Sequence, residues 1–125
     1  MFDEKTKRKI WDKGRKVEGF SEEIIRKDCC GAWIKYDDYA VRDSDFGWEI
    51  DHVYPIAMGG KDDEVNLRPM QWRNNMEKGD DYPTYSALII ADSTRNIEQI
   101  RELTVNQKLR EKLNELYGEK SYENY

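Results

Sequence analysis

The stretch from Phe46 to Tyr54 reads FGWEIDHVY and is followed directly by Pro55. Its aromatic and β-branched residues predict a strand, and Pro55 ends that strand because proline cannot donate to a strand ladder. A loop containing Gly59 and Gly60 comes next, and the spacing of apolar residues then predicts a helix over residues 67–78. The order of strand, loop and helix in this part of the chain decides the fold.

Shorter elements are expected on either side of this unit. The upstream elements are a helix within residues 4–17, a short helix over 22–27 with Ser21 as its N-cap, a strand over 32–36 and a return strand over 39–42. The downstream elements are a strand over 87–91, a weaker return strand over 97–103 that could equally begin a helix, a capping box at Thr104 and Gln107, and a helix that ends before Gly118. Together these patterns predict an α+β fold.

Length and composition predict one folded domain over residues 1–125. Hydrophobic residues make up 38% of the 125 residues and aromatic residues 12%, which argues against disorder. The longest apolar run, residues 87–91, is far shorter than the roughly 20 residues that a membrane span needs. No apolar segment follows the basic start, so a cytoplasmic location without a membrane partner is expected.

The formal net charge of −5 hides an uneven distribution. Residues 1–27 carry nine Lys or Arg against six Asp or Glu, whereas residues 35–64 carry three against nine. Binding to nucleic acid depends on a positive surface that displaces counterions from phosphates. The basic N-terminal segment is therefore the expected region of such contacts, although most charge runs are simply solvated faces.

His52 is the only histidine of the chain, and its neighbours form a pattern. An acid–His pair precedes a turn, two glycines mark a loop, and asparagines stand in the middle and near the end. The residues concerned are Asp51, His52, Gly59, Gly60, Asn66, Asn75 and Lys78. Over residues 46–80 this pattern resembles the HNH endonuclease motif. The resemblance implies a ββα-metal (His-Me finger) core with flanking N-terminal helices and a C-terminal hairpin plus helix. It also implies a metal-dependent endonuclease that hydrolyses DNA phosphodiester bonds.

Hydrolysis of a phosphodiester needs an activated water and neutralisation of phosphoryl charge, and one imidazole and one divalent ion can divide these tasks. The resemblance assigns His52 as the general base and places the ion on Asp51 and Asn75. Oxygen ligands of this kind suit Mg²⁺ or Mn²⁺. Strict alternation along a strand would point Asp51 and His52 to opposite faces. Both serve one site only if the strand ends there, as Pro55 indicates.

The remaining positions are given supporting roles. Asn66 resembles the middle residue of the motif, which ties the loop to the strand and holds the base in place. DNA phosphate contacts are expected from three basic side chains, Lys78, Arg68 and Arg73, with solvated helix charges as an equal alternative. Glu49 shares a strand face with Asp51 and is a weaker candidate for holding a metal-bound water.

The chain departs from the motif where many such proteins carry two cysteine pairs for a structural zinc. Its only cysteines, Cys29 and Cys30, are adjacent, and Gln71 and Asn74 occupy the late positions. No structural zinc is expected, and the cysteines are interpreted as relics or buried small hydrophobes. Support is expected instead from three tryptophans, Trp33, Trp48 and Trp72.

Two alternative functions stay open on the sequence. One is a nucleic-acid-binding module in which the same fold persists without turnover. The other is a protein-interaction module that uses the acidic middle segment and the C-terminal helix. The intact set of Asp51, His52, Asn66 and Asn75 argues against a decayed enzyme. Incubation of plasmid DNA with Mg²⁺ discriminates these cases, because only the enzyme cuts the DNA.

Overall fold

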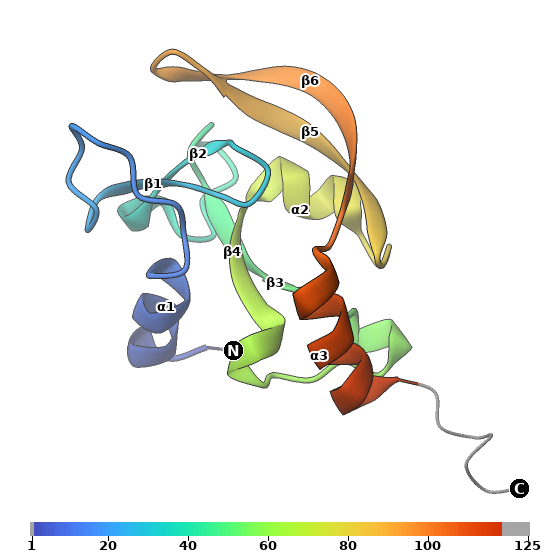
Figure 1. Cartoon of the computed structure of the whole chain (residues 1–125). Helices are drawn as coiled ribbons and strands as arrows, with labels where there is room; N and C mark the ends of the chain where they lie inside the picture. The colour runs from blue at the N-terminus through green and yellow to red at the C-terminus, as the bar shows by residue number, and fades with distance from the viewer. Residues whose placement is uncertain (1, 119–125) are drawn as a thin grey trace, which may run out of the picture.

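The computed structural model describes residues 2–118 and shows a mixed fold of helices and small antiparallel sheets (Figure 1). The helices are α1 (Glu4–Trp11), α2 (Trp72–Lys78) and α3 (Gln107–Tyr117), with 3-10 turns η1 (Tyr36–Asp38), η2 (Ile56–Met58) and η3 (Glu64–Asn66). The strands are β1 (Ile25–Lys27), β2 (Trp33–Lys35), β3 (Trp48–His52), β4 (Leu67–Gln71), β5 (Thr84–Asp92) and β6 (Arg95–Thr104). They pair as β1–β2, β3–β4 and β5–β6. The predicted α+β class is confirmed.

Strands β3 and β4 and helix α2 form one continuous unit. The strands pair antiparallel from Trp48 opposite Gln71 to His52 opposite Leu67. Helix α2 begins directly after β4, because Oε1 of Gln71 accepts hydrogen bonds from two N–H groups of the first turn at 2.8 and 3.0 Å. The C-terminal end of β3 therefore lies close to α2.

The predicted helix over residues 67–78 is wrong in its first part. Residues 67–71 form β4, and only residues 72–78 are helical. Leu67 and Met70 have helical spacing in the sequence, yet both are also buried when this segment is extended. Pairing with β3 gives the extended backbone its hydrogen-bond partners, and this tertiary pairing decides between two conformations that the apolar spacing alone does not separate.

The N-terminal segment also differs from the sequence prediction. Helix α1 ends at Trp11 rather than near residue 17, and the predicted helix over 22–27 is replaced by a turn followed by β1. Arg26 of β1 is 3% exposed, and a buried cation needs acceptors. Its guanidinium donates to the main-chain carbonyls of Glu22, Asp12 and Gly14. These contacts and the pairing with β2 stabilise the extended form.

The expected return strand over residues 39–42 is absent. Strand β2 takes β1 as its partner, and Tyr39 makes only an isolated parallel bridge to Trp48. Downstream, the two predicted strands are confirmed as the longer β5 and β6. Helix α3 is confirmed with a different cap: Oδ1 of Asn106 accepts from the N–H of Leu109 at 2.8 Å, while Thr104 is still the last residue of β6.

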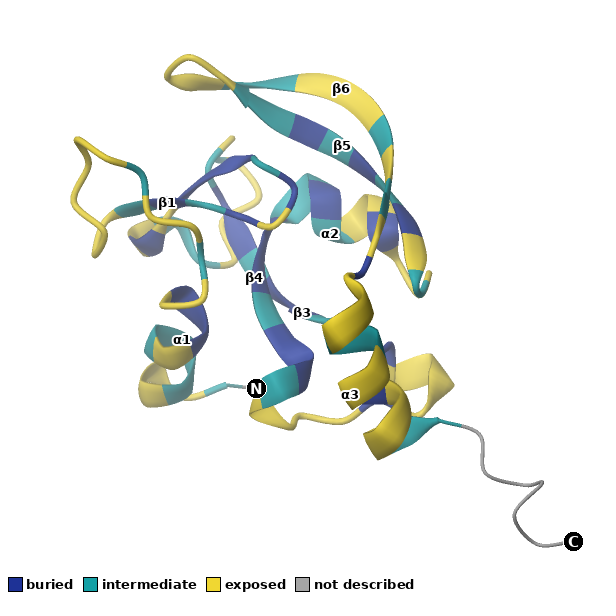
Figure 2. Cartoon of the chain, viewed as in Figure 1, coloured by how far each residue is buried: buried dark blue, intermediate teal, exposed yellow. Residues whose placement is uncertain are grey.

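The buried apolar side chains form two clusters, and Figure 2 colours the buried residues of the chain dark blue. One lies between α1 and the strands β2, β3 and β4 and contains Ile10, Trp11, Ile34, Tyr36, Trp48, Ile50 and Leu67. The other lies between β4, the β5–β6 hairpin and α3, and contains Cys30, Val53, Tyr54, Met70, Tyr85, Ala87, Val105 and Leu113. Trp48 lies within the first cluster with its ring centroid 5.1 Å from that of Trp11. No helix within residues 2–118 is long and apolar enough to cross a membrane.

Candidate active site

An open pocket of 240 Å³ lies at the C-terminal end of β3, beside α2. It brings together three residues predicted for catalysis and metal binding, Asp51, His52 and Asn75. Strand β3 ends at His52, and the chain then turns through Pro55 into η2. Asp51 and His52 therefore border the same pocket in spite of their alternation along β3. The remaining lining residues are Ile50, Pro55, Ile56, Gly79 and Asp80.

The imidazole of His52 has one nitrogen engaged by an acidic side chain. Nε2 lies 2.7 Å from Oδ1 of Asp62, which belongs to the segment between η2 and η3. When Nε2 carries the ring proton, it donates to Asp62, and the lone pair of Nδ1 can accept a proton. In the sequence Asp62 is only one member of an acidic run, so this contact was not predicted.

The carboxylate of Asp51 is buried between two cations. Arg68 Nε lies 3.0 Å from Oδ2, and Lys78 Nζ lies 3.3 Å from Oδ1. Lys78 also donates to the main-chain carbonyl of His52 at 3.1 Å. A charge at 4% exposure requires such partners, and the register of β3 and β4 supplies one of them by placing Arg68 opposite Asp51. The two cations fix the orientation of the carboxylate.

This arrangement differs from the predicted phosphate contacts. The side chain of Lys78 is 0% exposed and that of Arg68 is 13% exposed, so both cations face the protein interior. Arg73, the third predicted contact, has a side chain that is 35% exposed, and its Nη2 lies 3.4 Å from Glu98. Arg73 is the member of this group whose side chain stays accessible to solvent. The sequence does not show which charges become buried, because burial follows from strand register and helix placement.

Asn75 is held by a carboxylate that is itself held by an arginine. Its Nδ2 donates to Oε1 of Glu49 at 3.0 Å, and Arg42 donates to both oxygens of Glu49 at 2.7 and 3.0 Å. Burial raises the pKa of Glu49, but the hydrogen bonds from Arg42 and Asn75 outweigh it and leave this pKa below its ordinary value. Glu49 thus engages the amide nitrogen of Asn75, and the amide oxygen is the atom that could ligate a metal ion.

Asn66 ties the loop to the end of β3. Its Oδ1 accepts from the N–H of Tyr54 at 2.7 Å, and its Nδ2 donates to the carbonyls of Tyr54 and Lys61 at 3.1 and 3.0 Å. Gly60 lies in the same loop, where a Cβ atom would stand 1.9 Å from the carbonyl oxygen of Tyr54. The close approach of the two backbones therefore requires glycine. Together these contacts define the path of the chain next to His52.

A buried polar cluster occupies the positions where the motif pattern has zinc cysteines. Oδ1 of Asp28 accepts from the N–H groups of Cys30 and Ala32 at 2.9 and 2.8 Å. Oδ2 accepts from the N–H of Gln71 at 2.9 Å and from Nδ2 of Asn74 at 3.2 Å. Burial raises the pKa of Asp28, while these four donors favour its ionised form and oppose that shift. Sequence analysis singled out Gln71 and Asn74 but missed Asp28, their common partner.

Most basic side chains of α1 already have partners within the molecule. Arg8 stacks on the ring of Tyr36 with its Cζ 3.9 Å from the centroid. The ammonium group of Lys9 lies 4.0 Å from Glu64. Lys5 and Lys9 are exposed residues of this helix. The excess of basic residues in the N-terminal sequence is therefore larger than the number of free charges on its surface.

The donor set at the pocket fits Mg²⁺ or Mn²⁺. Asp51 offers carboxylate oxygen and Asn75 offers amide oxygen, and hard divalent ions complete such sets with water. Residues 2–118 contain no group of three His, Cys, Asp or Glu side chains placed to hold a metal. Comparisons of the chain with protein-family models, curated proteins and solved structures find no match. An inference of function therefore depends on the chemistry of this pocket.

Proposed function

We propose that this chain is a metal-dependent endonuclease of the HNH type that hydrolyses DNA phosphodiester bonds. The observation that carries the proposal is the convergence of Asp51, His52 and Asn75 on one open pocket. These residues belong to the unit formed by β3, β4 and α2, whose order of strand, strand and helix is that of a ββα-metal core. We infer that this unit is such a core.

His52 acts as the general base in this proposal. Its Nδ1 takes a proton from the attacking water, and the ring becomes an imidazolium ion. The carboxylate of Asp62, 2.7 Å from Nε2, stabilises that positive charge and keeps the ring in one orientation. Asn66 supports the same geometry, because its hydrogen bonds fix the backbone that follows His52.

The ion in this proposal is held by Asp51 and Asn75. A bound divalent ion supplies charge neutralisation at the phosphoryl oxygens and at the leaving oxygen. Arg68 and Lys78 orient the carboxylate of Asp51, and Glu49 orients the amide of Asn75. Positioning residues of this kind commonly change metal affinity by about 10- to 100-fold when they are replaced.

One observation favours the alternative of a nucleic-acid-binding module without turnover. Both carboxylate oxygens of Asp51 already face cations, Arg68 and Lys78. These charges repel a divalent ion, and a buried carboxylate that is fully paired has less negative charge to offer. Weak metal binding would then leave a fold that contacts DNA without cleaving it. A protein-interaction module is the further alternative, in which neither DNA nor metal is bound.

A plasmid-nicking assay with a metal series tests the proposal. Supercoiled DNA is incubated with the protein in Mg²⁺, Mn²⁺, Ca²⁺ or EDTA, and Mn²⁺ binding is measured separately by titration calorimetry. Nicking in Mg²⁺ or Mn²⁺, together with Mn²⁺ binding that Asp51→Ala removes, supports the nuclease. Binding of DNA without nicking in any metal supports the silent module. Intact plasmid together with the absence of DNA binding supports the protein-interaction module.

A further inference from the structure

We propose that Cys29 and Cys30 form a second binding site, for a trivalent arsenic compound that takes two thiols, and that Arg68 links occupation of this site to Asp51. The link to metal binding depends on the proposed function, whereas the thiol site does not. Both cysteines are free, and they are the only cysteines of the chain. Any reaction at sulfur other than methionine is therefore confined to this pair.

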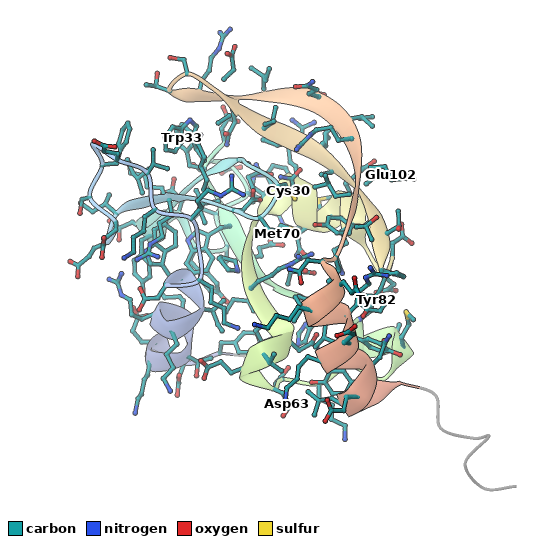
Figure 3. The ribbon with its side chains drawn as sticks, viewed as in Figure 1. Cys30, Trp33, Asp63, Met70, Tyr82 and Glu102 are labelled. Carbon is teal, nitrogen blue, oxygen red and sulfur yellow. The ribbon has the colours of Figure 1, made fainter. Side chains whose placement is uncertain are left out.

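The turn between β1 and β2 holds the two sulfur atoms together. The Sγ atoms lie 3.8 Å apart, within reach of one bridging atom. Asp28 fixes the turn through the N–H groups of Cys30 and Ala32, and Gly31 continues it at a φ of +87°. Cys29 is an exposed residue, whereas Cys30 belongs to the buried cluster that also contains Met70 (Figure 3). A ligand can therefore meet Cys29 first and Cys30 second.

A chain of contacts leads from this pair to the candidate active site. Sγ of Cys29 lies 3.9 Å from the hydroxyl oxygen of Tyr85. The guanidinium carbon of Arg68 stands 5.2 Å from the centroid of the Tyr85 ring, and Nε of Arg68 lies 3.0 Å from Asp51. Nη2 of Arg68 is buried and makes no hydrogen bond with any described residue. The guanidinium of Arg68 thus contacts Asp51 through Nε, while its Nη2 has no hydrogen-bond partner among the described residues.

The charges around the pair favour reaction at Cys29. The thiol of Cys30 donates toward Cys29 and lowers the pKa of Cys29; burial opposes this shift, Arg68 adds to it, and the pKa stays below its ordinary value. The same contact, together with burial, raises the pKa of Cys30. The thiolate is the reactive form of a cysteine, so Cys29 is the first nucleophile. Cys30 then closes the ring on the same ligand atom.

The reaction needs no oxidant. In an organic arsenic oxide, R–As=O, the two sulfurs replace the oxygen: two As–S bonds form, the oxygen leaves as one water with the proton of Cys30 and the proton that Cys29 released to solvent, and arsenic stays trivalent. The product carries no charge on either sulfur. With both sulfurs bound to arsenic, Cys29 can no longer ionise beside Arg68, so Asp51 does not share the charge of Arg68 with Cys29 and the attraction between Arg68 and Asp51 increases. A divalent ion at Asp51 competes against that stronger pair, so occupation of the thiol site is expected to weaken metal binding.

The binding part is tested with phenylarsine oxide on the full chain. Intact mass spectrometry should show one adduct per wild-type chain, which persists in excess monothiol and is removed by 2,3-dimercaptopropanol. Cys29→Ser and Cys30→Ala, each with one thiol, should lose the adduct in monothiol. An adduct on either variant that resists monothiol would overturn the two-thiol site, as would a wild-type adduct that monothiol removes. Cys30→Ser provides a second variant if Cys30→Ala does not fold.

The link to Asp51 is tested by measuring Mn²⁺ affinity with and without bound phenylarsine oxide. The adduct should weaken Mn²⁺ binding by roughly fivefold or more, the lower range of coupling between two sites. Cys29→Ser has no ionisable sulfur beside Arg68, so its Mn²⁺ affinity should already be lowered as the adduct lowers it, and phenylarsine oxide should not change it further. Circular dichroism verifies that the adduct is folded. An adduct on folded protein with unchanged Mn²⁺ affinity would overturn the link. If the unmodified wild type does not bind Mn²⁺, the proposed nuclease site is refuted, whereas the proposed two-thiol site is not affected by that result.

Discussion

At the residue scale, the assignment of His52 depends on a contact that is distant in sequence. Asp62 lies ten residues after His52 and holds Nε2 at 2.7 Å. The remaining nitrogen, Nδ1, is the one available for water. The hydrogen bond to Asp62 favours the tautomer with the proton on Nε2. Nδ1 is then unprotonated, and a general base needs an unprotonated nitrogen to accept a proton.

Replacement of the base tests this assignment. His52→Ala should lower the rate of Mg²⁺-dependent nicking by about 10²- to 10⁴-fold, the usual contribution of a general base. The Mn²⁺ dissociation constant and the melting temperature should stay close to the wild-type values, because the ring is placed beside the ion site and not in the core. Asp62→Asn should give a smaller loss, since the ring is kept but its orientation is weakened. Nicking by folded His52→Ala at the wild-type rate would refute the role.

Glu49 gives a second prediction at this scale, because it fixes the amide of Asn75. Glu49→Ala should weaken Mn²⁺ binding by roughly 10- to 100-fold, as replacement of a group that orients a metal ligand commonly does. Glu49→Gln keeps an oxygen that can accept from Asn75 and should recover part of the affinity. Glu98→Ala is the matched control, since Glu98 is an exposed residue whose side chain pairs with Arg73 and not with Asn75. Equal Mn²⁺ affinities in Glu49→Ala and the control would contradict the orienting role.

At the element scale, Asp28 connects the turn after β1 with the start of α2. All four of its hydrogen bonds come from N–H donors. The two oxygens of a carboxylate accept all four, whereas the NH₂ group of an asparagine cannot accept any. Asp28→Asn should lower the free energy of unfolding by roughly 1–3 kcal/mol, because one or two buried donors lose their acceptor. Urea unfolding measures this loss. Asp92→Asn is the control, with an expected change within about 0.5 kcal/mol because its pair with Arg95 is exposed.

The elements that the sequence predicted well are those whose signal is local. Aromatic and β-branched residues indicated β3, the apolar run over residues 87–91 indicated β5, and the spacing of leucines indicated α3. Strand β4 was predicted as a helix, because its conformation is decided by pairing with β3. The cluster around Asp28 was missed for the same reason: Asp28 and Gln71 lie 43 residues apart, and nothing local relates them.

The candidate site shows the same difference between residues with a local sequence signal and contacts between distant residues. The motif pattern indicated Asp51, His52 and Asn75, and the structure brings them to one pocket. The motif pattern did not indicate that Lys78 and Arg68 are buried against Asp51, because the sequence alone does not show whether a lysine or arginine is buried. Contacts between residues distant in sequence therefore account for most of what sequence analysis left out.

At the scale of the whole molecule, we expect any DNA contacts of α1 to come from its two exposed lysines, Lys5 and Lys9, since the pair of Lys9 with Glu64 is long at 4.0 Å and exposed. Lys5→Gln with Lys9→Gln should raise the DNA dissociation constant and reduce the slope of log affinity against log salt by up to about 2, since each phosphate contact contributes about 0.9. Turnover at saturating DNA should persist. Lys108→Gln on α3 is the control. An unchanged slope would show that these lysines are only a solvated face.

Metal removal makes a separate prediction for the molecule. EDTA should abolish nicking without lowering the melting temperature, because the clusters of apolar side chains and the polar cluster around Asp28 hold the fold. Addition of Mg²⁺ should restore nicking. Differential scanning calorimetry with and without EDTA measures the first expectation. A protein that contains stoichiometric zinc and melts earlier on chelation would contradict the absence of a structural zinc.

Asn74 has a consequence for how copies of this chain meet one another. The hairpin of β5 and β6 is a two-stranded sheet, and an unpaired strand edge is a template for aggregation. The amide oxygen of Asn74 accepts from the N–H groups of Leu88 and Ile89, and the carbonyl of Gly31 accepts from the N–H of Ala91. This edge of β5 is therefore closed to a strand from a neighbouring molecule. One asparagine takes over part of the role of a missing third strand and protects this edge of β5 from edge-to-edge pairing.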